Sequence, residues 1–272
     1  MVPAASAFDV RRAIPTTVRA GSFFMVYFGP SITGIWDGKN VKPFISFTEA
    51  YQHLFLVTLH TISGMCPHAL IPYKPKNPKT RLSSLLSQEE REAFAFAMLE
   101  DVVSAAKDAM CSPVVVGTEL FDSELVQVTV KDADLNQTLN EILPTVETGL
   151  LILMADLPLA DEASIRRVTS TAKDLAIVPG RGGGTNVIFM KEPKKFHVDY
   201  YGTSFVKHMK IAADAGLSVE VVDSFRLHTD IDEEDDLVEL LIHGTGKSRA
   251  YLESLGFSLA TETGRVRCVR KR

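Results

Sequence analysis

Four cationic side chains gather in one proline-rich stretch, IPYKPKNPKTRLS at residues 71–83. They are Lys74, Lys76, Lys79 and Arg81. The prolines rule out a regular helix, so we predict a constrained loop between a strand at residues 68–73 and a helix that begins near Ser87. Backbone donors, a helix N-terminus and cations that face the same ligand would bind a polyphosphate. The alternative interpretation is a solvent-exposed basic loop.

Three aspartates could bind a divalent metal ion. Asp156 ends the apolar run GLLILMAD, which places a carboxylate at the carboxyl edge of a predicted buried strand, where ligands bind in open α/β sheets. Asp230 and Asp232 lie two residues apart in HTDIDEEDDL, on the same side of an extended backbone. Carboxylates suit Mg²⁺ bound beside a nucleotide, so we predict Mg²⁺ as the cofactor. Asp156 alone could instead cap the following helix.

Two further segments could bind anions. The glycine-rich run PGRGGGTN at residues 179–186 lets the backbone approach an anionic ligand, whose oxygen atoms Arg181, Thr185 or Asn186 could then bind. The alternative there is a flexible hairpin. The run YGTSFVKH places Gly202 and Ser204 at the start of a helix, which is a second plausible anion site.

Three other features favour structural interpretations. His208, in the first turn of that helix, would more often be a structural residue. The acids at residues 233–236 are expected to form the solvated first turn of a helix, where they complement its dipole. The run HGTGKS at residues 243–248 is not a phosphate-binding loop, because GxxxxGKS requires glycine at the position of Leu241.

The elements that must position these residues alternate in type from residue 68 onward, which predicts an α/β fold with a mainly parallel sheet. The helix after Ser87 opens with a capping box that Glu90 completes. Further strands are predicted at 113–119, 124–130, 149–156, 175–179, 185–191 and 217–223, and further helices at 135–142, 162–174, 204–215 and 234–254.

Composition excludes several classes of function. A net charge of -5 and a pI near 5.8 argue against a nucleic-acid partner, so the basic loop is a local feature. Cys66, Cys111 and Cys268 show no CxxC spacing, which favours neither a disulfide framework nor a zinc site and predicts a reducing cytoplasm. Residues 50–73 are long enough to span a membrane but contain too many polar residues, so we expect no membrane partner.

Residues 1–66 differ from the rest of the chain. They carry a formal charge of +2, whereas the remainder carries -7, and they show neither sustained helical periodicity nor clean strand alternation. We therefore expect a leader that is poorly ordered, or translated upstream sequence, outside a catalytic domain at residues 67–272. A small appended domain is the less favoured alternative.

The motifs described above, in their order along the chain, closely resemble the archaeal 2-phospho-L-lactate guanylyltransferases of coenzyme F-420 biosynthesis. The resemblance spans about residues 68–272 and also includes DLNQTL, MADLPL and TDIDEEDDL. It implies a Rossmann-like nucleotidyltransferase of the glycosyltransferase-A type, a three-layer sandwich with a mainly parallel mixed sheet. The implied activity transfers GMP from GTP to 2-phospho-L-lactate, with pyrophosphate as the second product, and the implied assembly is a homodimer.

The resemblance also implies roles for individual residues. The metal ligands of the family fall on Asp156, Asp230 and Asp232, and its contacts to the phosphate and carboxylate of the small substrate fall on Thr185 and on Ser204 with the neighbouring backbone at Tyr201 or Gly202. Lys74, Lys79 and Arg81 would hold the triphosphate, and Asn136 is a candidate guanine contact.

The implied reaction needs no covalent enzyme intermediate, because a phosphate oxygen of the acceptor is already an anion and can attack the α-phosphorus in line. Phosphoenolpyruvate as the acceptor, a non-catalytic nucleotide-binding protein and a sugar-transferring enzyme remain alternatives.

Overall fold

The computed structural model describes most of the chain from residue 67 onward. Side chains are described for residues 67–117, 134–260 and 264–271, and the backbone alone for residues 16–20, 23–28, 31–36, 41–43 and 127–130. The chain divides into two compact units, Met1–Ile62 and Ser63–Arg272. Each unit is described by itself.

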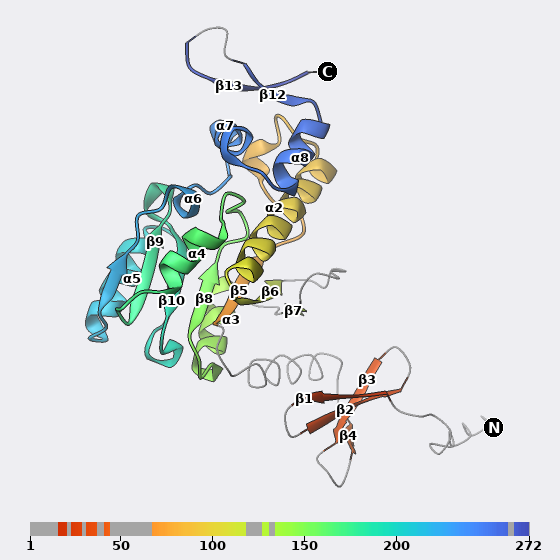
Figure 1. Ribbon diagram of the computed structural model, residues 1–272, viewed down its shortest axis with the longest axis vertical. Coiled ribbons are helices and arrows are strands. Elements are labelled where there is room, and N and C mark those ends of the chain that lie inside the picture. Colours follow the sequence, from red (N-terminus) through yellow and green to blue (C-terminus); the bar gives the residue numbers. More distant parts are fainter. Residues whose placement is uncertain are drawn as a thin grey trace, which may run out of the picture. The chain divides into compact units, whose positions relative to one another are not determined.

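The first unit contains an antiparallel sheet in the order β1-β2-β3-β4 (Figure 1). Its strands are β1 (Thr16–Ala20), β2 (Phe23–Phe28), β3 (Ser31–Trp36) and β4 (Val41–Pro43). The sequence had indicated no strands here, because β2 reads FFMVYF, which is apolar throughout and shows no alternation. Aromatic and β-branched residues nevertheless favour extended backbone. The placement of residues 1–66 outside the catalytic domain stays a prediction.

A seven-stranded mixed sheet forms the centre of the second unit, in the order β11-β9-β10-β8-β5-β6-β7 (Figure 1). All neighbouring pairs are parallel except the two that involve β10. This confirms the predicted mainly parallel α/β architecture. The strands are β5 (His68–Tyr73), β6 (Ser112–Gly117), β7 (Gln127–Val130), β8 (Leu150–Leu153), β9 (Leu175–Pro179), β10 (Thr185–Met190) and β11 (Val219–Val221).

Both faces of this sheet are covered. Leu151 and Leu153 belong to a hydrophobic cluster with Phe94 of α2, whereas Leu150 and Ile152 point to the opposite face and are equally buried. The result is a three-layer arrangement. The helices are α2 (Gln88–Asp108), α3 (Leu135–Ile142), α4 (Glu162–Thr169), α5 (Ser204–Asp214), α6 (Phe225–His228), α7 (Glu234–His243) and α8 (Lys247–Ser254).

Helix α2 begins as the sequence predicts. Ser87 is its N-cap and accepts from the Glu90 amide, while the Glu90 carboxylate accepts from the Ser87 amide, so the predicted capping box is confirmed. Arg270 of strand β13 (Arg267–Arg270) donates to the same Glu90 carboxylate, with N–O distances of 2.5 and 3.0 Å. This contact fastens the two-stranded sheet of β13 and β12 (Phe257–Ala260) to the start of α2.

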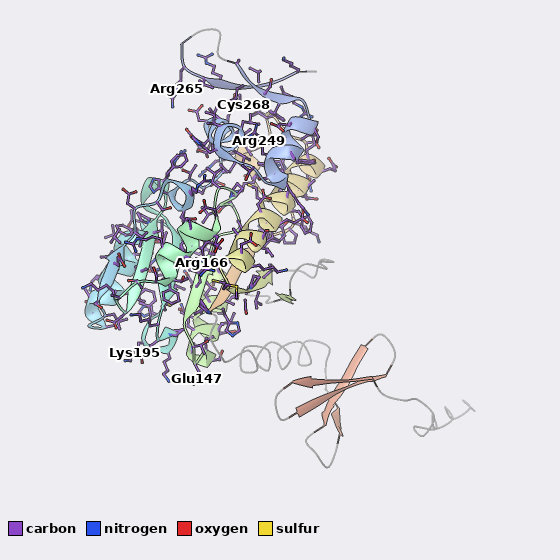
Figure 2. All side chains as sticks on the ribbon, viewed as in Figure 1. Glu147, Arg166, Lys195, Arg249, Arg265 and Cys268 are labelled. Atoms are coloured by element: carbon purple, nitrogen blue, oxygen red, sulfur yellow. The ribbon has the colours of Figure 1, made fainter. Side chains whose placement is uncertain are left out.

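Ion pairs at the periphery of the second unit contribute little to stability. Glu147, Arg166 and Lys195 are labelled in Figure 2. The ion pairs of these residues, such as the 2.8 Å contact between Arg166 Nε and Glu162 Oε1, join side chains that are about half exposed. Exposed pairs of this kind typically contribute about 0–1 kcal/mol.

Among the described residues, no helix is long and apolar enough to span a membrane. Of the apolar stretch at residues 50–73, residues 50–66 lie outside the described residues.

The prediction of a single helix at residues 234–254 is wrong. The segment that contains Gly244 and Gly246 divides it into α7 and α8. A Cβ on Gly244 would lie 2.6 Å from the Leu240 carbonyl oxygen, and a Cβ on Gly246 would lie 2.3 Å from Asp101 Oδ1. Asp101 accepts from the Lys247 and Ser248 amides at 2.7 and 3.0 Å. The HGTGKS run therefore forms a helix start that a carboxylate caps.

We expect Asp101→Ala to lower the free energy of unfolding by about 1–2 kcal/mol, because it removes this cap. The KM for GTP, the nucleotide that the family resemblance implies, should not change. Urea unfolding and steady-state kinetics check the two parts, and Asp108→Ala, which removes an exposed acid near the end of the same helix, is the control. A large change in the KM for GTP would contradict the structural interpretation of HGTGKS.

Candidate active site

The three predicted metal ligands meet at the carboxyl edge of the sheet. Asp156 follows β8 by three residues, and its carbonyl oxygen accepts from the Ile231 amide at 3.0 Å. That bond holds the segment carrying Asp230 and Asp232 against the end of β8. Carboxylate oxygen atoms of the three aspartates lie within 4.8 Å of one another. Three converging hard oxygen ligands suit Mg²⁺, so the residues present fit the predicted cofactor.

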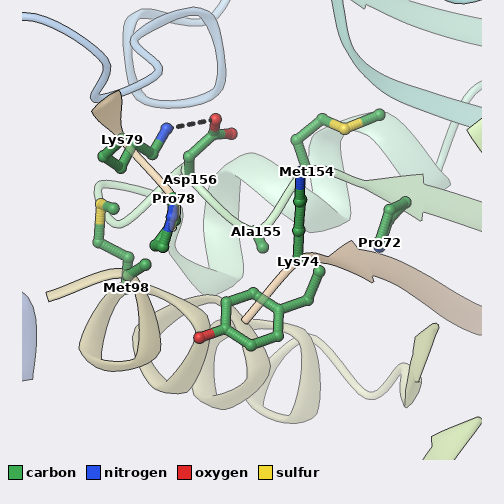
Figure 3. A pocket seen from close by; sticks show the side chains of 10 residues that line it. Pro72, Lys74, Pro78, Lys79, Met98, Met154, Ala155 and Asp156 are labelled. Atoms are coloured by element: carbon green, nitrogen blue, oxygen red, sulfur yellow. Dashed lines mark hydrogen bonds and ion pairs between the residues drawn. The ribbon is translucent and has the colours of Figure 1, made fainter. Parts of the chain in front are cut away.

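Lys79 lies between two of these aspartates. Its Nζ lies 2.7 Å from Asp156 Oδ2 and 2.5 Å from Asp232 Oδ1, and Figure 3 shows the contact with Asp156. Burial lowers the pKa of the Lys79 ammonium, but the charges and hydrogen bonds of the two aspartates outweigh burial, so the net pKa lies above its usual value. The basic loop and the acidic cluster are therefore parts of one site.

The other predicted cations differ in their surroundings. Arg81 Nη1 lies 3.5 Å from Asp232 Oδ2 and 3.4 Å from Glu233 Oε1, and the arginine side chain is 66% exposed. It can therefore reach a ligand from solvent. Lys74 lies at the end of β5 and lines both cavities described next.

Two cavities open beside Lys74. The smaller, of about 170 Å³, is lined by residues that include Lys74, Lys79 and Asp156 (Figure 3). The larger, of about 380 Å³, lies at the ends of β5 and β6 and is lined by Pro72, Tyr73, Lys74, Val116, Gly117, Asp134, Leu135, Thr138, Met154 and Tyr201. Together they form a site at the sheet edge, the place where ligands bind in open α/β folds.

Asn186 is predicted to bind substrate, and that role stays a prediction; in the structure its amide nitrogen contacts the chain that carries Asp230. Its buried Nδ2 donates to the carbonyl oxygens of Leu227 and His228 at 3.0 and 3.1 Å, and lies 3.5 Å from Asp230 Oδ1. A Cβ on Gly180 would lie 2.1 Å from the Asn186 side-chain oxygen, so glycine makes room for this carboxamide. Asn186 therefore positions Asp230. Burial and the charge of Asp156 raise the pKa of Asp230 above its usual range.

Arg181 of the glycine-rich loop forms an ion pair with Asp236. Asp236 is buried, and its Oδ2 also accepts from the amides of Asp232 and Glu233 at 2.9 and 2.8 Å. The expectation that residues 233–236 are all solvated is thus wrong for Asp236, whereas Asp235 is exposed. The sequence did not single out Asp236, because its side chain is indistinguishable from its acidic neighbours without the fold. Asp236 links the glycine-rich loop to Asp232, one of the predicted metal ligands.

Asn136 was a candidate guanine contact, but both ends of its carboxamide bind the backbone of Tyr200. Its Oδ1 accepts from the Tyr200 amide at 2.7 Å, and its Nδ2 donates to the Tyr200 carbonyl at 3.3 Å. Asn140, one helical turn later, pairs with the backbone of Val198 in the same way, at 2.8 and 2.9 Å. These two asparagines of α3 hold the segment that precedes Tyr201 and Gly202.

The predicted acceptor residues lie together at the start of α5. Ser204 Oγ and Thr185 Oγ1 are hydrogen-bonded at 3.2 Å, and both side chains are buried. Tyr201 and Gly202 both have positive φ angles, of 80° and 61°, and this turn directs the chain into α5. A positive φ is uncommon for tyrosine and marks a constrained turn. The binding roles of Thr185, Gly202 and Ser204 stay predictions.

We expect Asp236→Asn to weaken Mg²⁺ binding in the presence of GTP by about tenfold or more, because outer residues that orient metal ligands have effects of that size. Isothermal titration calorimetry measures it. Asp235→Asn removes the same charge from an exposed neighbour and should leave the affinity unchanged. Equal affinities for the two variants would show that Asp236 does not orient the site.

A second prediction concerns pH. Burial lowers the pKa of His208 to about 4, below the value of 6.5 for an unperturbed histidine. The unfolded chain therefore binds a proton that the folded chain does not, so this residue should reduce stability as the pH falls from about 6.5 to about 4, by about 3 kcal/mol at most. Urea unfolding at pH 7 and pH 4.5 should show a steeper loss for the wild type than for His208→Gln. Parallel losses would contradict this expectation.

Comparison with known proteins adds independent evidence. The chain is 70% identical over 202 residues to a 2-phospho-L-lactate guanylyltransferase from Methanoregula boonei, covering 74% of this chain and 94% of that protein. It is 56% identical over 201 residues to a protein of the same name from Methanoculleus marisnigri, covering 73% and 94%.

A solved structure supports the fold. A protein from Desulfovibrio desulfuricans G20, described as a candidate nucleotide-diphospho-sugar transferase, superimposes with a TM-score of 0.56 over 70% of this chain and 95% of that chain, at 15% identity. The family model described as "Guanylyl transferase CofC like" matches residues 67–272. Given this match and the identity to the archaeal enzymes, the chain belongs to the CofC-like guanylyl transferase family.

Proposed function

We propose that this protein transfers GMP from GTP to 2-phospho-L-lactate, which gives lactyl-2-diphospho-5′-guanosine and pyrophosphate. The observation that carries the proposal is the meeting of Lys79 with Asp156 and Asp232 at the sheet edge. A triphosphate needs cations, and a metal ion that binds it needs carboxylates. Both sets of groups lie beside the same pair of cavities.

The nucleotide is assigned to these cavities. The larger one is framed by the ends of β5 and β6 and by the start of α3, and its volume of about 380 Å³ suits a nucleoside. Lys74 lines both cavities, so it can contact the phosphates of a nucleotide whose nucleoside occupies the larger one. Lys79 and Arg81 lie nearer the aspartates. The Lys79 ammonium has three N–H donors and contacts two aspartates, so it can also donate to a phosphate oxygen.

Asp156, Asp230 and Asp232 would hold Mg²⁺, which supplies positive charge to the phosphates of the reaction. Asp236, held by its ion pair with Arg181, would fix the position of Asp232 by accepting from its backbone amide. Asn186 would fix the position of Asp230.

The acceptor is assigned to Thr185, Ser204 and the turn at Gly202. A phosphate oxygen of the acceptor attacks the α-phosphorus of GTP, a new P–O bond forms, and the bond to the β-phosphate oxygen breaks as pyrophosphate leaves. The nucleophile is an anion at neutral pH and requires no strong base. The contribution of the protein is then positioning and charge neutralisation.

Phosphoenolpyruvate is the second candidate acceptor, because it differs from phospholactate by one unsaturation. The decisive experiment incubates the protein with Mg²⁺, each of the four nucleoside triphosphates, and either acceptor, and measures pyrophosphate. We expect release with GTP and phospholactate. Absence of release with GTP and either acceptor would contradict the proposed function, and faster release with phosphoenolpyruvate would change the acceptor.

We predict that Asp156→Asn lowers the rate of pyrophosphate release by roughly a hundredfold or more, which is the size of effect seen when one preorganised charge contact is lost. Circular dichroism should show an unchanged fold. Asp214→Asn removes an exposed acid that pairs only with Lys210 in the described contacts, and it should retain full activity. Near-normal turnover of Asp156→Asn would refute its assignment to the metal site.

We further place the protein in the cytoplasm as a homodimer. The support is the family relationship and, among the described cysteines, the fact that Cys111 and Cys268 are buried and form no disulfide. Light scattering of the purified chain determines the oligomeric state.

A further inference from the structure

His208 is a buried histidine that the proposed reaction does not use. Its side chain is completely shielded from solvent, and both ring nitrogens have partners. Nδ1 lies 2.9 Å from Thr185 Oγ1, and Nε2 lies 3.0 Å from the backbone nitrogen of Asp199. The histidine therefore joins one of the predicted acceptor residues to the segment that α3 holds.

These contacts determine where the imidazole carries its proton. A backbone amide can only donate, so Nε2 must be the unprotonated nitrogen that accepts from Asp199. The proton of the neutral ring then resides on Nδ1, which donates to Thr185 Oγ1. Burial keeps the pKa of His208 at about 4, so the ring is neutral at pH 7.

The donor on Nδ1 determines the direction of the hydroxyl of Thr185. Thr185 Oγ1 accepts from His208 Nδ1, so the hydroxyl hydrogen of Thr185 must point away from the imidazole. That hydrogen has two possible partners, Ser204 Oγ, which lies 3.2 Å away, and an oxygen of the bound acceptor. An anionic oxygen of the acceptor is the partner that such a hydrogen suits, since hydrogen bonds to charged groups are the stronger ones.

The ring itself is held on two sides. Tyr200 meets it edge-on, with ring centroids 4.9 Å apart, and Phe196 lies 6.0 Å away. The Asp199 amide is fixed because its neighbours Val198 and Tyr200 are bound by the asparagines of α3. His208 therefore has one available orientation.

We propose that His208 is a positioning residue of the acceptor subsite, which fixes the hydroxyl of Thr185 as a hydrogen-bond donor to the phosphate or carboxylate of the acceptor. This inference rests on the proposed function. It assigns to His208 no contact with the reacting atoms.

Two substitutions of similar size separate this role from a merely structural one. The polar atoms of asparagine are bonded to Cγ, as Nδ1 of histidine is, so His208→Asn can retain the donor to Thr185. In glutamine the polar atoms lie one bond further out, as Nε2 does, so His208→Gln can retain only the contact with Asp199. We expect His208→Gln to raise the KM for phospholactate by about tenfold and His208→Asn by less than about threefold, because one hydrogen bond to a charged group has about this value.

The KM for GTP should be unchanged in both variants. Similar values of the KM for phospholactate in the two folded variants, or an equal increase in both KM values, would overturn the positioning role. If the wild type releases no pyrophosphate with GTP, the proposed function fails instead. Should neither variant fold, ¹⁵N NMR of the wild-type histidines decides the matter. A proton on Nδ1 of His208 supports the inference, and a proton on Nε2 overturns it.

Discussion

The carboxylates of Asp156, Asp230 and Asp232 have oxygen atoms within 4.8 Å of one another, although like charges at such distances repel. The surrounding structure holds them together. The Ile231 amide binds the carbonyl of Asp156, so the backbones cannot separate. The ammonium of Lys79 compensates part of the charge, and it comes from a loop that is 77 residues away from Asp156 in the chain. The basic loop and the carboxyl edge of the sheet are thus held in one place by electrostatic attraction.

Around this centre, side-chain amides and carboxylates are directed at the backbone rather than at a ligand. Asn186 holds the chain next to Asp230, Asp236 holds the amide of Asp232, and Asn136 holds Tyr200. Loops have no ladder of hydrogen bonds, so their buried backbone groups need such partners. The consequence is that the proposed ligand-binding residues of these loops have little freedom, as preorganised catalysis requires.

Much of the second unit could be predicted because its signals are local. Strand β5, strand β9 and helix α3 have the predicted bounds, and the capping box at Ser87 is formed by residues three apart. The roles of Asn136, Asn186 and Asp236 could not be predicted. A carboxamide or carboxylate has the same chemistry whether it faces a nucleotide or a peptide group, and the fold alone decides between these partners. The strands of the first unit were missed for a different reason, since β2 shows no alternation.

The close approach of Gly180 to Asn186 constrains how this site can change during evolution or in the laboratory. Any side chain at position 180 would overlap the carboxamide, whose oxygen would lie 2.1 Å from the new Cβ. A larger residue at 180 is therefore compatible only with a smaller or displaced side chain at 186, which would release the chain beside Asp230. The two positions should be randomised together in any library that seeks a new acceptor, because most single changes at either would be eliminated before their effect on specificity could be seen.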